Sequence, residues 1–222
     1  MSKSRPLLAL LLAIGILPLL LNGLYNSYLS QTPHIYWTAE ILTWVVLPAV
    51  LLGVAFHRKL FSTTDIGLHI RIFGRSSWPL FLAATVVISV LVVAIYGYST
   101  EAAHKLFSTN HGAGSFFYRD VVPGSGLLRF LVLVYLCLSA GIVEELYFRG
   151  MTRLLFSKNW SGSLLYIATT AIVFSLIHWE GGVWNLTEAF LFGLATSALY
   201  VVSGNLWPLI IGHALTDYFW FS

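Results

Sequence analysis

The sequence is poor in charged residues and in cysteine. Of its 222 residues only 9% are Asp, Glu, Lys or Arg, whereas 58% are hydrophobic. A soluble domain carries about 25% charged residues, because it needs a polar surface. A surface in contact with lipid does not, so the composition excludes an ordinary soluble domain and favours an integral membrane protein. The single cysteine, Cys137, excludes a disulfide within the chain and is expected to be a buried apolar side chain.

Long apolar runs predict the architecture. A helix needs about 20 apolar residues to cross a bilayer core of roughly 30 Å. Seven segments qualify or nearly qualify, and they are residues 6–25, 37–56, 78–98, 127–157, 162–180, 184–203 and 206–221. We therefore expect an all-α, polytopic membrane protein with about seven transmembrane helices, in which residues 1–222 form a single membrane domain.

The basic residues predict the orientation, since cytoplasmic loops carry an excess of Lys and Arg. If the N-terminus is cytoplasmic, nine basic residues lie on that side: Lys3, Arg5, Arg58, Lys59, Arg71, Arg75, Arg149, Arg153 and Lys158. Three lie on the other side: Lys105, Arg119 and Arg129. The sequence therefore predicts a cytoplasmic N-terminus. The connection at residues 57–77 is either a segment in the membrane interface or a solvated loop.

The fourth apolar run contains charged residues. Charges near the middle of a bilayer cost about 2.5–3.5 kcal/mol each on insertion scales, so they are candidate functional residues. Glu145 and Arg149 are four residues apart on one helix face and can neutralise each other. Glu144 points about 100° away from that pair. One carboxylate is then structural and the other available, unless both share Arg149 and only fix helix packing.

Residues that could take part in catalysis recur in two later runs. Phe174 lies one turn before His178 in the fifth run, and His213 lies four residues before Asp217 in the seventh. Taken alone, His178 is more typical of a hydrogen-bonded core residue, and the second pair of an isolated polar contact near a span end. A buried carboxylate that meets an imidazole would instead suit general acid–base catalysis.

Residue spacing brings these positions to similar depths. Ser161, in the turn between the fourth and fifth runs, is 17 residues from both Glu144 and His178, so antiparallel helices return the two side chains to one level. His213 lies only about nine residues from the turn near Gly204. It can share that level if the fourth and fifth runs project roughly 11 Å further into the cytoplasm. We therefore expect the site to open toward the cytoplasmic half of the membrane.

The three motifs together resemble a known family. They read Glu144-Glu145-x-x-x-Arg149, Phe174-x-x-x-His178 and His213-x-x-x-Asp217. This pattern resembles the signature of the CPBP (Abi) intramembrane proteases, which include the CAAX prenyl endopeptidases and bacteriocin-processing proteins. The resemblance covers residues 127–218, which we interpret as the catalytic core with the three motifs. Residues 1–98 resemble the family only as generic membrane helices of uncertain role.

The resemblance implies a role for each motif residue. Glu144 with His178 would activate a water molecule, and His213 with Asp217 would stabilise the oxyanion. Glu145, Arg149 and Phe174 would support the site. The family often has Asn in place of Asp217, and an ionised Asp cannot donate a hydrogen bond. Either Asp217 is protonated, or it orients His213, which then donates alone.

The resemblance thus implies a glutamic-type intramembrane endopeptidase that hydrolyses a peptide bond of a membrane-associated protein or peptide without a cofactor. Three alternatives stay open. Glu144, His178 and His213 could hold zinc, although no His-Glu-x-x-His is present. The chain could also be a non-catalytic scaffold or a proton-coupled transporter.

The expected partners follow from this interpretation. They are membrane lipids and a membrane-associated protein or peptide substrate, with no nucleic acid. The sequence does not indicate an oligomeric state. By analogy with the family, the small size of the chain favours the bacterial cytoplasmic membrane as its location.

Overall fold

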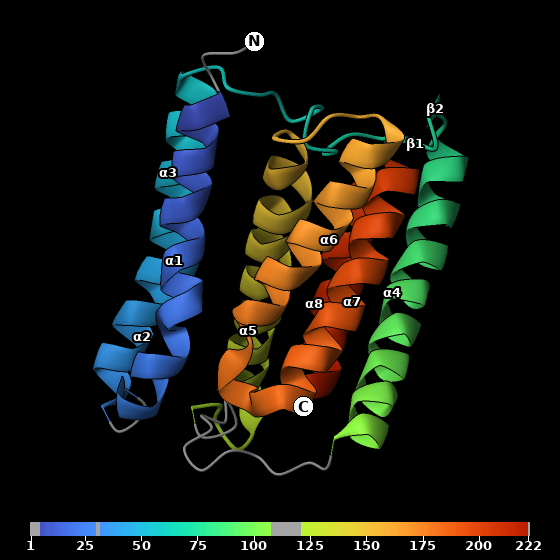
Figure 1. Cartoon of the computed structure of the whole chain (residues 1–222). Helices are drawn as coiled ribbons and strands as arrows, with labels where there is room; N and C mark the ends of the chain where they lie inside the picture. Colours follow the sequence, from blue (N-terminus) through green and yellow to red (C-terminus); the bar gives the residue numbers. More distant parts are fainter. Residues whose placement is uncertain (1–4, 30–31, 108–120, 222) are drawn as a thin grey trace.

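The computed structural model describes residues 5–29, 32–107 and 121–221, which are almost entirely helical (Figure 1). Helix α1 is Arg5–Leu29. The next crossing is one continuous helix made of α2 (Pro33–Ile41), the π-helix η1 (Leu42–Val46) and α3 (Leu47–His57). Helix α4 is Trp78–Leu106, and α5 (Gly126–Glu144) continues as the π-helix η3 (Glu145–Met151). The remaining elements are α6 (Trp160–Leu176), the 3-10 turn η4 (Trp179–Gly181), α7 (Gly182–Ser203) and α8 (Trp207–Phe221).

The prediction of an all-α polytopic membrane protein is confirmed. Each of the seven apolar runs lies on a helix, and five segments are long and apolar enough to cross a membrane. These five are Arg5–Gly23, Pro33–His57, Trp78–Leu106, Gly126–Met151 and Trp179–Ser203. Helices α6 and α8 are shorter, with 17 and 15 residues. At 1.5 Å per residue they extend about 26 Å and 22 Å, so each covers less of a bilayer than the other helices.

The surface and the interior differ in the way that a membrane environment requires. On α4, Val86, Val87 and Val90 are 64%, 65% and 63% exposed. Such a row of exposed branched side chains suits contact with lipid. In contrast, Glu145 and Arg149 have no exposed surface. The chain therefore presents apolar side chains outward and keeps these charged groups inside the helix bundle.

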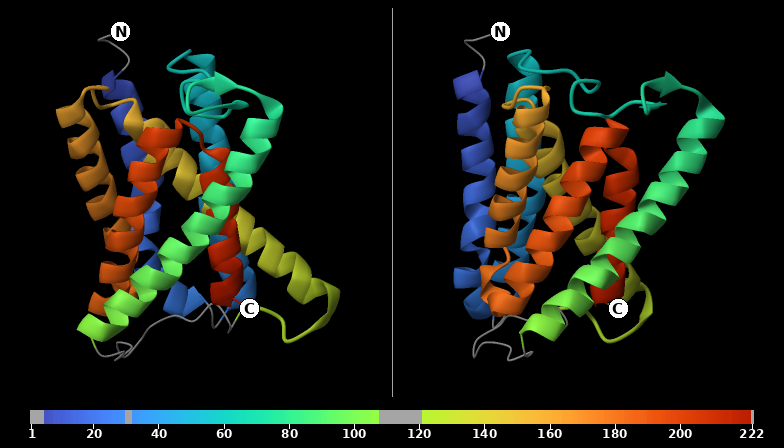
Figure 2. Two further views of the ribbon diagram at one scale, coloured as in Figure 1. Left: turned by 90° about the vertical axis from the view of Figure 1, so that its right-hand side faces the viewer. Right: turned by 45° about the vertical axis from the view of Figure 1, so that its right-hand side comes forward.

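The helices that carry the three motifs pack together. Helix α6 packs against α7, and α8 lies between α4 and α5. Helix α4 crosses the α7–α8 pair obliquely (Figure 2). Helices α1, α2 and α3 form a neighbouring group that touches the bundle at η3 and α5 (Figure 1).

The two termini lie at opposite ends of the bundle, as an odd number of crossings requires (Figure 1). Which end faces the cytoplasm stays a prediction. Two of the basic residues used for it, Lys3 and Arg119, lie outside the described residues.

The connection between α3 and α4 contains the only β-strands among the described residues. Strands β1 (Arg71–Ile72) and β2 (Arg75–Ser76) form a short antiparallel pair. Asn205, in the turn between α7 and α8, donates hydrogen bonds to two carbonyls of this connection at 2.6 and 2.9 Å. Ile72 is fully buried. This connection is therefore packed over the α7–α8 turn and is not simply a solvated loop.

Candidate active site

The first motif lies where α5 widens into a π-helix. Glu144 is the last residue of α5 and Glu145 the first of η3. π-Helical turns are rare and occur frequently at functional sites. Within η3, Nη1 of Arg149 lies 3.1 Å from Oε1 of Glu145, and neither side chain is exposed. The predicted Glu145–Arg149 pair is confirmed, and Glu144 is left to face another partner.

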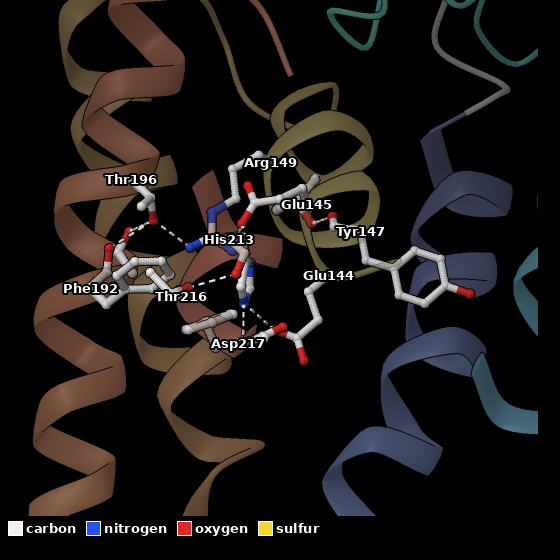
Figure 3. Close-up of polar contacts among 12 residues, drawn as sticks. Glu144, Glu145, Tyr147, Arg149, Phe192, Thr196, His213, Thr216 and Asp217 are labelled. Atoms are coloured by element: carbon white, nitrogen blue, oxygen red, sulfur yellow. Dashed lines mark hydrogen bonds and ion pairs between the residues drawn. The ribbon is translucent and has the colours of Figure 1, made fainter. Parts of the chain in front are cut away.

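That partner is His213 of α8, whose ring lies between the two glutamates (Figure 3). Its Nδ1 is 2.8 Å from Oε1 of Glu145. Its Nε2 is 3.6 Å from Oε2 of Glu144 and 3.8 Å from Oδ1 of Asp217. Because Glu145 is a carboxylate paired with Arg149, Nδ1–H is the natural donor to it. The Nε2 atom then faces both Glu144 and Asp217.

Arg149 is held from three directions although it is wholly buried. Besides the contact with Glu145, its Nη2 donates a hydrogen bond to Oγ1 of Thr196 at 2.5 Å. Its guanidinium carbon also lies 4.4 Å from the centre of the Phe174 ring, which is a cation–π contact. A buried charge needs both a counter-ion and hydrogen-bond partners. Arg149 has the counter-ion and one acceptor, Thr196, while its Nε and Nη1 have no hydrogen-bond partner among the described residues. The ion pair still lets it fix Glu145 and, through Glu145, His213.

Phe174 connects this ion pair to the second motif. Its ring centre lies 4.9 Å from that of His178 and 6.0 Å from that of His213. The Nδ1 atom of His178 is 2.9 Å from the carbonyl oxygen of Phe174. An Nδ1–H that donates to this carbonyl leaves Nε2 of His178 as the acceptor nitrogen. Phe174 thus packs beside Arg149 and both histidines, as a supporting residue would.

A close approach of two helices positions His213. A Cβ atom placed on Gly141 of α5 would lie 3.1 Å from the backbone nitrogen of Ala214 and 3.2 Å from the carbonyl oxygen of Ile210. Only glycine allows α8 to approach this closely, because the atoms that a Cβ would meet belong to rigid backbone. The contact lies one turn before Glu145 and beside His213. It therefore sets the distance between the imidazole and the two carboxylates.

The predicted site residues share one cavity of about 390 Å³. Those that line it are Glu144, Phe174, His178, His213 and Asp217. The imidazole in contact with Glu144 is that of His213, and His178 contributes to the wall of the same cavity. The structure thus brings together residues from all three motifs, with Glu145 and Arg149 packed behind them.

The cavity extends toward one end of the bundle. Its wall includes Glu180 of η4 and Phe221 at the end of α8, so it reaches the end at which the C-terminus lies (Figure 1). The N-terminus lies at the opposite end. The expectation of a cytoplasmic N-terminus and the expectation of a site that opens to the cytoplasmic half therefore do not both hold.

The zinc alternative needs at least three ligands around one point. Among the described residues, no group of three or more His, Cys, Asp or Glu side chains is placed to hold a metal ion.

Comparison with known proteins identifies the region that holds the site. Residues 126–219 match the family described as Type II CAAX prenyl endopeptidase Rce1-like. These residues form an Rce1-like domain. The Rce1-like domain runs from α5 to α8, contains all the motif residues from Glu144 to Asp217, and leaves α1 to α4 outside. No curated protein and no solved structure matched the chain.

Two residues that shape the Rce1-like site were missed by sequence reasoning. Thr196 accepts a hydrogen bond from Arg149, and Gly141 allows α8 to pack closely against α5. A threonine in a membrane helix is not a strong functional signal, because burying its hydroxyl costs little free energy. The hydroxyl can donate to a carbonyl of its own helix, as Thr196 does to Phe192 at 2.7 Å. Gly141 lies one turn before the glutamates, and a glycine at that position could have indicated a close approach of another helix beside the site.

Proposed function

We propose that this integral membrane protein is an intramembrane endopeptidase that hydrolyses a peptide bond of a membrane-associated protein or peptide. One observation carries the proposal. In a domain of an endopeptidase family, a buried carboxylate, Glu144, faces a cavity together with the imidazoles of His178 and His213. The proposed location, the bacterial cytoplasmic membrane, would supply lipids and the substrate as the partners.

Glu144 is suited to act as the general base. Its Oε2 has no hydrogen-bond partner among the described residues, although the atom is buried. In the proposed reaction a water molecule occupies the cavity between Glu144 and the acceptor nitrogen of His178. Glu144 takes one proton from this water, and the resulting hydroxide attacks the carbonyl carbon of the scissile bond. Glu144 then returns the proton to the leaving amine as the carbon–nitrogen bond breaks.

His213 and Asp217 are suited to stabilise the oxyanion of the tetrahedral intermediate. Since Nδ1–H of His213 is directed to Glu145, the ring can donate to substrate only through Nε2. The donating form is therefore the imidazolium, with both nitrogens protonated. Glu145 and Arg149 act as positioning residues that hold the ring in this orientation. Donors placed in advance at the point where charge develops are a large contribution to catalysis.

A peptide panel tests this function. The purified protein is reconstituted in lipid nanodiscs and incubated with fluorogenic membrane peptides, with and without a strong zinc chelator. We expect cleavage of at least one peptide at an unchanged rate in the presence of the chelator. Cleavage lost on chelation would assign Glu144, His178 and His213 to a metal site. If no peptide were cleaved, the result would favour a transporter or a non-catalytic scaffold over an endopeptidase.

Asp217→Asn is expected to retain at least about one-tenth of the wild-type rate of cleavage, because the carboxamide keeps the shape of the side chain and can donate a hydrogen bond. The side chain lines the cavity, and its Oδ2 has no partner among the described residues. The rate is measured with the best peptide of the panel. An inactive but folded variant would show that an ionised Asp217 is needed to hold the imidazolium of His213.

Gly141→Val should lower the rate of cleavage by about 100-fold, since displacement of a catalytic group by about 1 Å is enough for such a loss. The added side chain would push α8, and His213 with it, away from Glu145. The matched control is Gly97→Val in α4, where an added Cβ meets no atom within 4 Å. Equal rates in the two variants would show that the Gly141 contact does not position the site.

A further inference from the structure

The cavity has a second polar wall that the proposed reaction does not use. Asn22 of α1 and Glu180 of η4 both line it, and Glu188 of α7 lines another part of the same cavity, where it contacts Thr100 of α4. Asn22 is 92% buried, since only 8% of its surface is exposed. Helix α1 lies outside the Rce1-like domain, so this wall joins the N-terminal helices to the candidate active site.

This wall is built by a specific contact between α1 and η4. The indole nitrogen of Trp179 donates a hydrogen bond to the carbonyl oxygen of Leu20 at 2.8 Å. One turn further along α1, a Cβ placed on Gly23 would lie 2.4 Å from Oε2 of Glu180. The glycine therefore allows the Glu180 carboxylate to lie directly against α1, beside Asn22. The two side chains are held by this contact between the helices and do not depend on a surface loop.

The oxygens of these two side chains need a hydrogen-bond donor. Oδ1 of Asn22 and Oε2 of Glu180 are buried and have no partner among the described residues. A buried acceptor without a donor costs free energy, so such atoms point to a ligand that supplies one. Glu188 differs, because it already accepts hydrogen bonds from Thr100 and from Nδ2 of Asn185.

The charge of the cavity defines the ligand further. Four acidic residues line it, namely Glu144, Glu180, Glu188 and Asp217, and the lining includes no lysine or arginine among the described residues. The imidazolium proposed for His213 faces Glu144 and Asp217, so the carboxylate of Glu180 is left to attract a cation beside Asn22.

We propose that Asn22 and Glu180 form a specificity subsite that binds the cationic side chain of a lysine or arginine in the peptide substrate. This inference rests on the proposed endopeptidase function, because the subsite lies in the same cavity as Glu144 and His213. It assigns a role to α1, which would then select substrates for the Rce1-like domain.

The test compares membrane peptides that differ at one position. Lysine is exchanged for norleucine, which lacks the charge, at successive positions on both sides of the central peptide bond. Each peptide is also made with a free and with an acetylated amino terminus. Binding is measured by fluorescence anisotropy on nanodisc-embedded Glu144→Gln protein, which removes the proposed base so that cleavage does not interfere. Cleavage of the same peptides is measured with the wild-type residue at position 144.

At one position we expect lysine to bind about tenfold or more tightly than norleucine, as a charge-assisted hydrogen bond would produce. Adding Glu180→Gln should bring this ratio close to one. Adding Glu40→Gln should leave it unchanged, because Glu40 is a buried glutamate of α2 outside the cavity. If the Glu180 variant does not fold, Asn22→Asp provides a second test, since an added carboxylate should raise the ratio.

Three results would overturn the subsite: equal affinity for lysine and norleucine at every position, a lysine preference that survives Glu180→Gln, or a preference for a free amino terminus with none for lysine. The two proposals fail in different ways. A Glu180-dependent preference in binding without cleavage of any peptide would refute the endopeptidase and support the subsite. Cleavage with no lysine preference in either assay would refute the subsite alone.

Discussion

Glu144→Gln is expected to lower the rate of peptide cleavage by about 10²–10⁴-fold, which is the usual contribution of a general acid–base group. Glutamine has nearly the same shape as glutamate, but its amide cannot take a proton from water at neutral pH. The Glu144 carboxylate is buried and faces the cavity, and the imidazole nearest to it is engaged by Glu145 through its other nitrogen. Asp217 is the other carboxylate beside His213, at 3.8 Å from its Nε2, and activity that remains in the Glu144→Gln protein would point to Asp217 as a substitute base.

The comparison needs a control for the loss of a buried carboxylate as such. Glu40→Gln provides it, because Glu40 is also buried, with 6% of its surface exposed, but lies on α2 and does not line the cavity. This variant should cleave peptides at the wild-type rate. The Glu144→Gln and Glu40→Gln proteins should each elute as a single symmetrical peak in size-exclusion chromatography. Wild-type turnover by a folded Glu144→Gln protein would remove Glu144 from the mechanism.

The parts of the fold that depend on local patterns were predictable. Runs of apolar residues determine which segments enter a bilayer, so all seven helices were located from sequence. The Glu145–Arg149 pair was predictable for a similar reason, since a spacing of four residues brings side chains together on a helix of any sequence. In the structure the pair persists in the π-helix η3, at 3.1 Å.

The parts that depend on packing between distant segments were not predictable. His213 was expected beside Asp217, but its contact with Glu145 joins residues 68 positions apart. That contact exists because Gly141 lets α8 approach α5 closely. A pattern of neighbouring residues in the sequence does not indicate which distant helix will approach. The same holds for Thr196, which meets Arg149 from another helix.

Residue counts from the turns predicted the relative depth of the site residues. Glu144 and His178, each 17 residues from Ser161, line the same cavity, and His213 lines it with them. Such counts do not indicate toward which end of the bundle a cavity extends, because that depends on the side chains that close its other end. The short strands at Arg71–Ile72 and Arg75–Ser76 escaped prediction because two-residue strands carry no periodicity.

Arg149→Ala is expected to destabilise the protein by about 3–5 kcal/mol, because removal of one partner leaves the other charge buried without compensation. Glu145 has no exposed surface, so its carboxylate cannot turn to solvent. The loss of the guanidinium also removes the contact with Phe174 and the hydrogen bond that Arg149 donates to Thr196. The temperature at which the protein loses its folded fraction in detergent, followed by size-exclusion chromatography, measures the effect.

The chain contains a matched control for this prediction. Glu101 and Lys105 form an ion pair of the same spacing, with an N–O distance of 2.6 Å, but their side chains are 60% and 73% exposed. Lys105→Ala should therefore leave the unfolding temperature nearly unchanged. A double variant, Glu145→Leu with Arg149→Leu, should recover much of the stability, since apolar residues can replace a buried pair at little cost. It should still be inactive, because Nδ1 of His213 loses its acceptor. Recovery of stability together with activity would show that the pair serves packing alone.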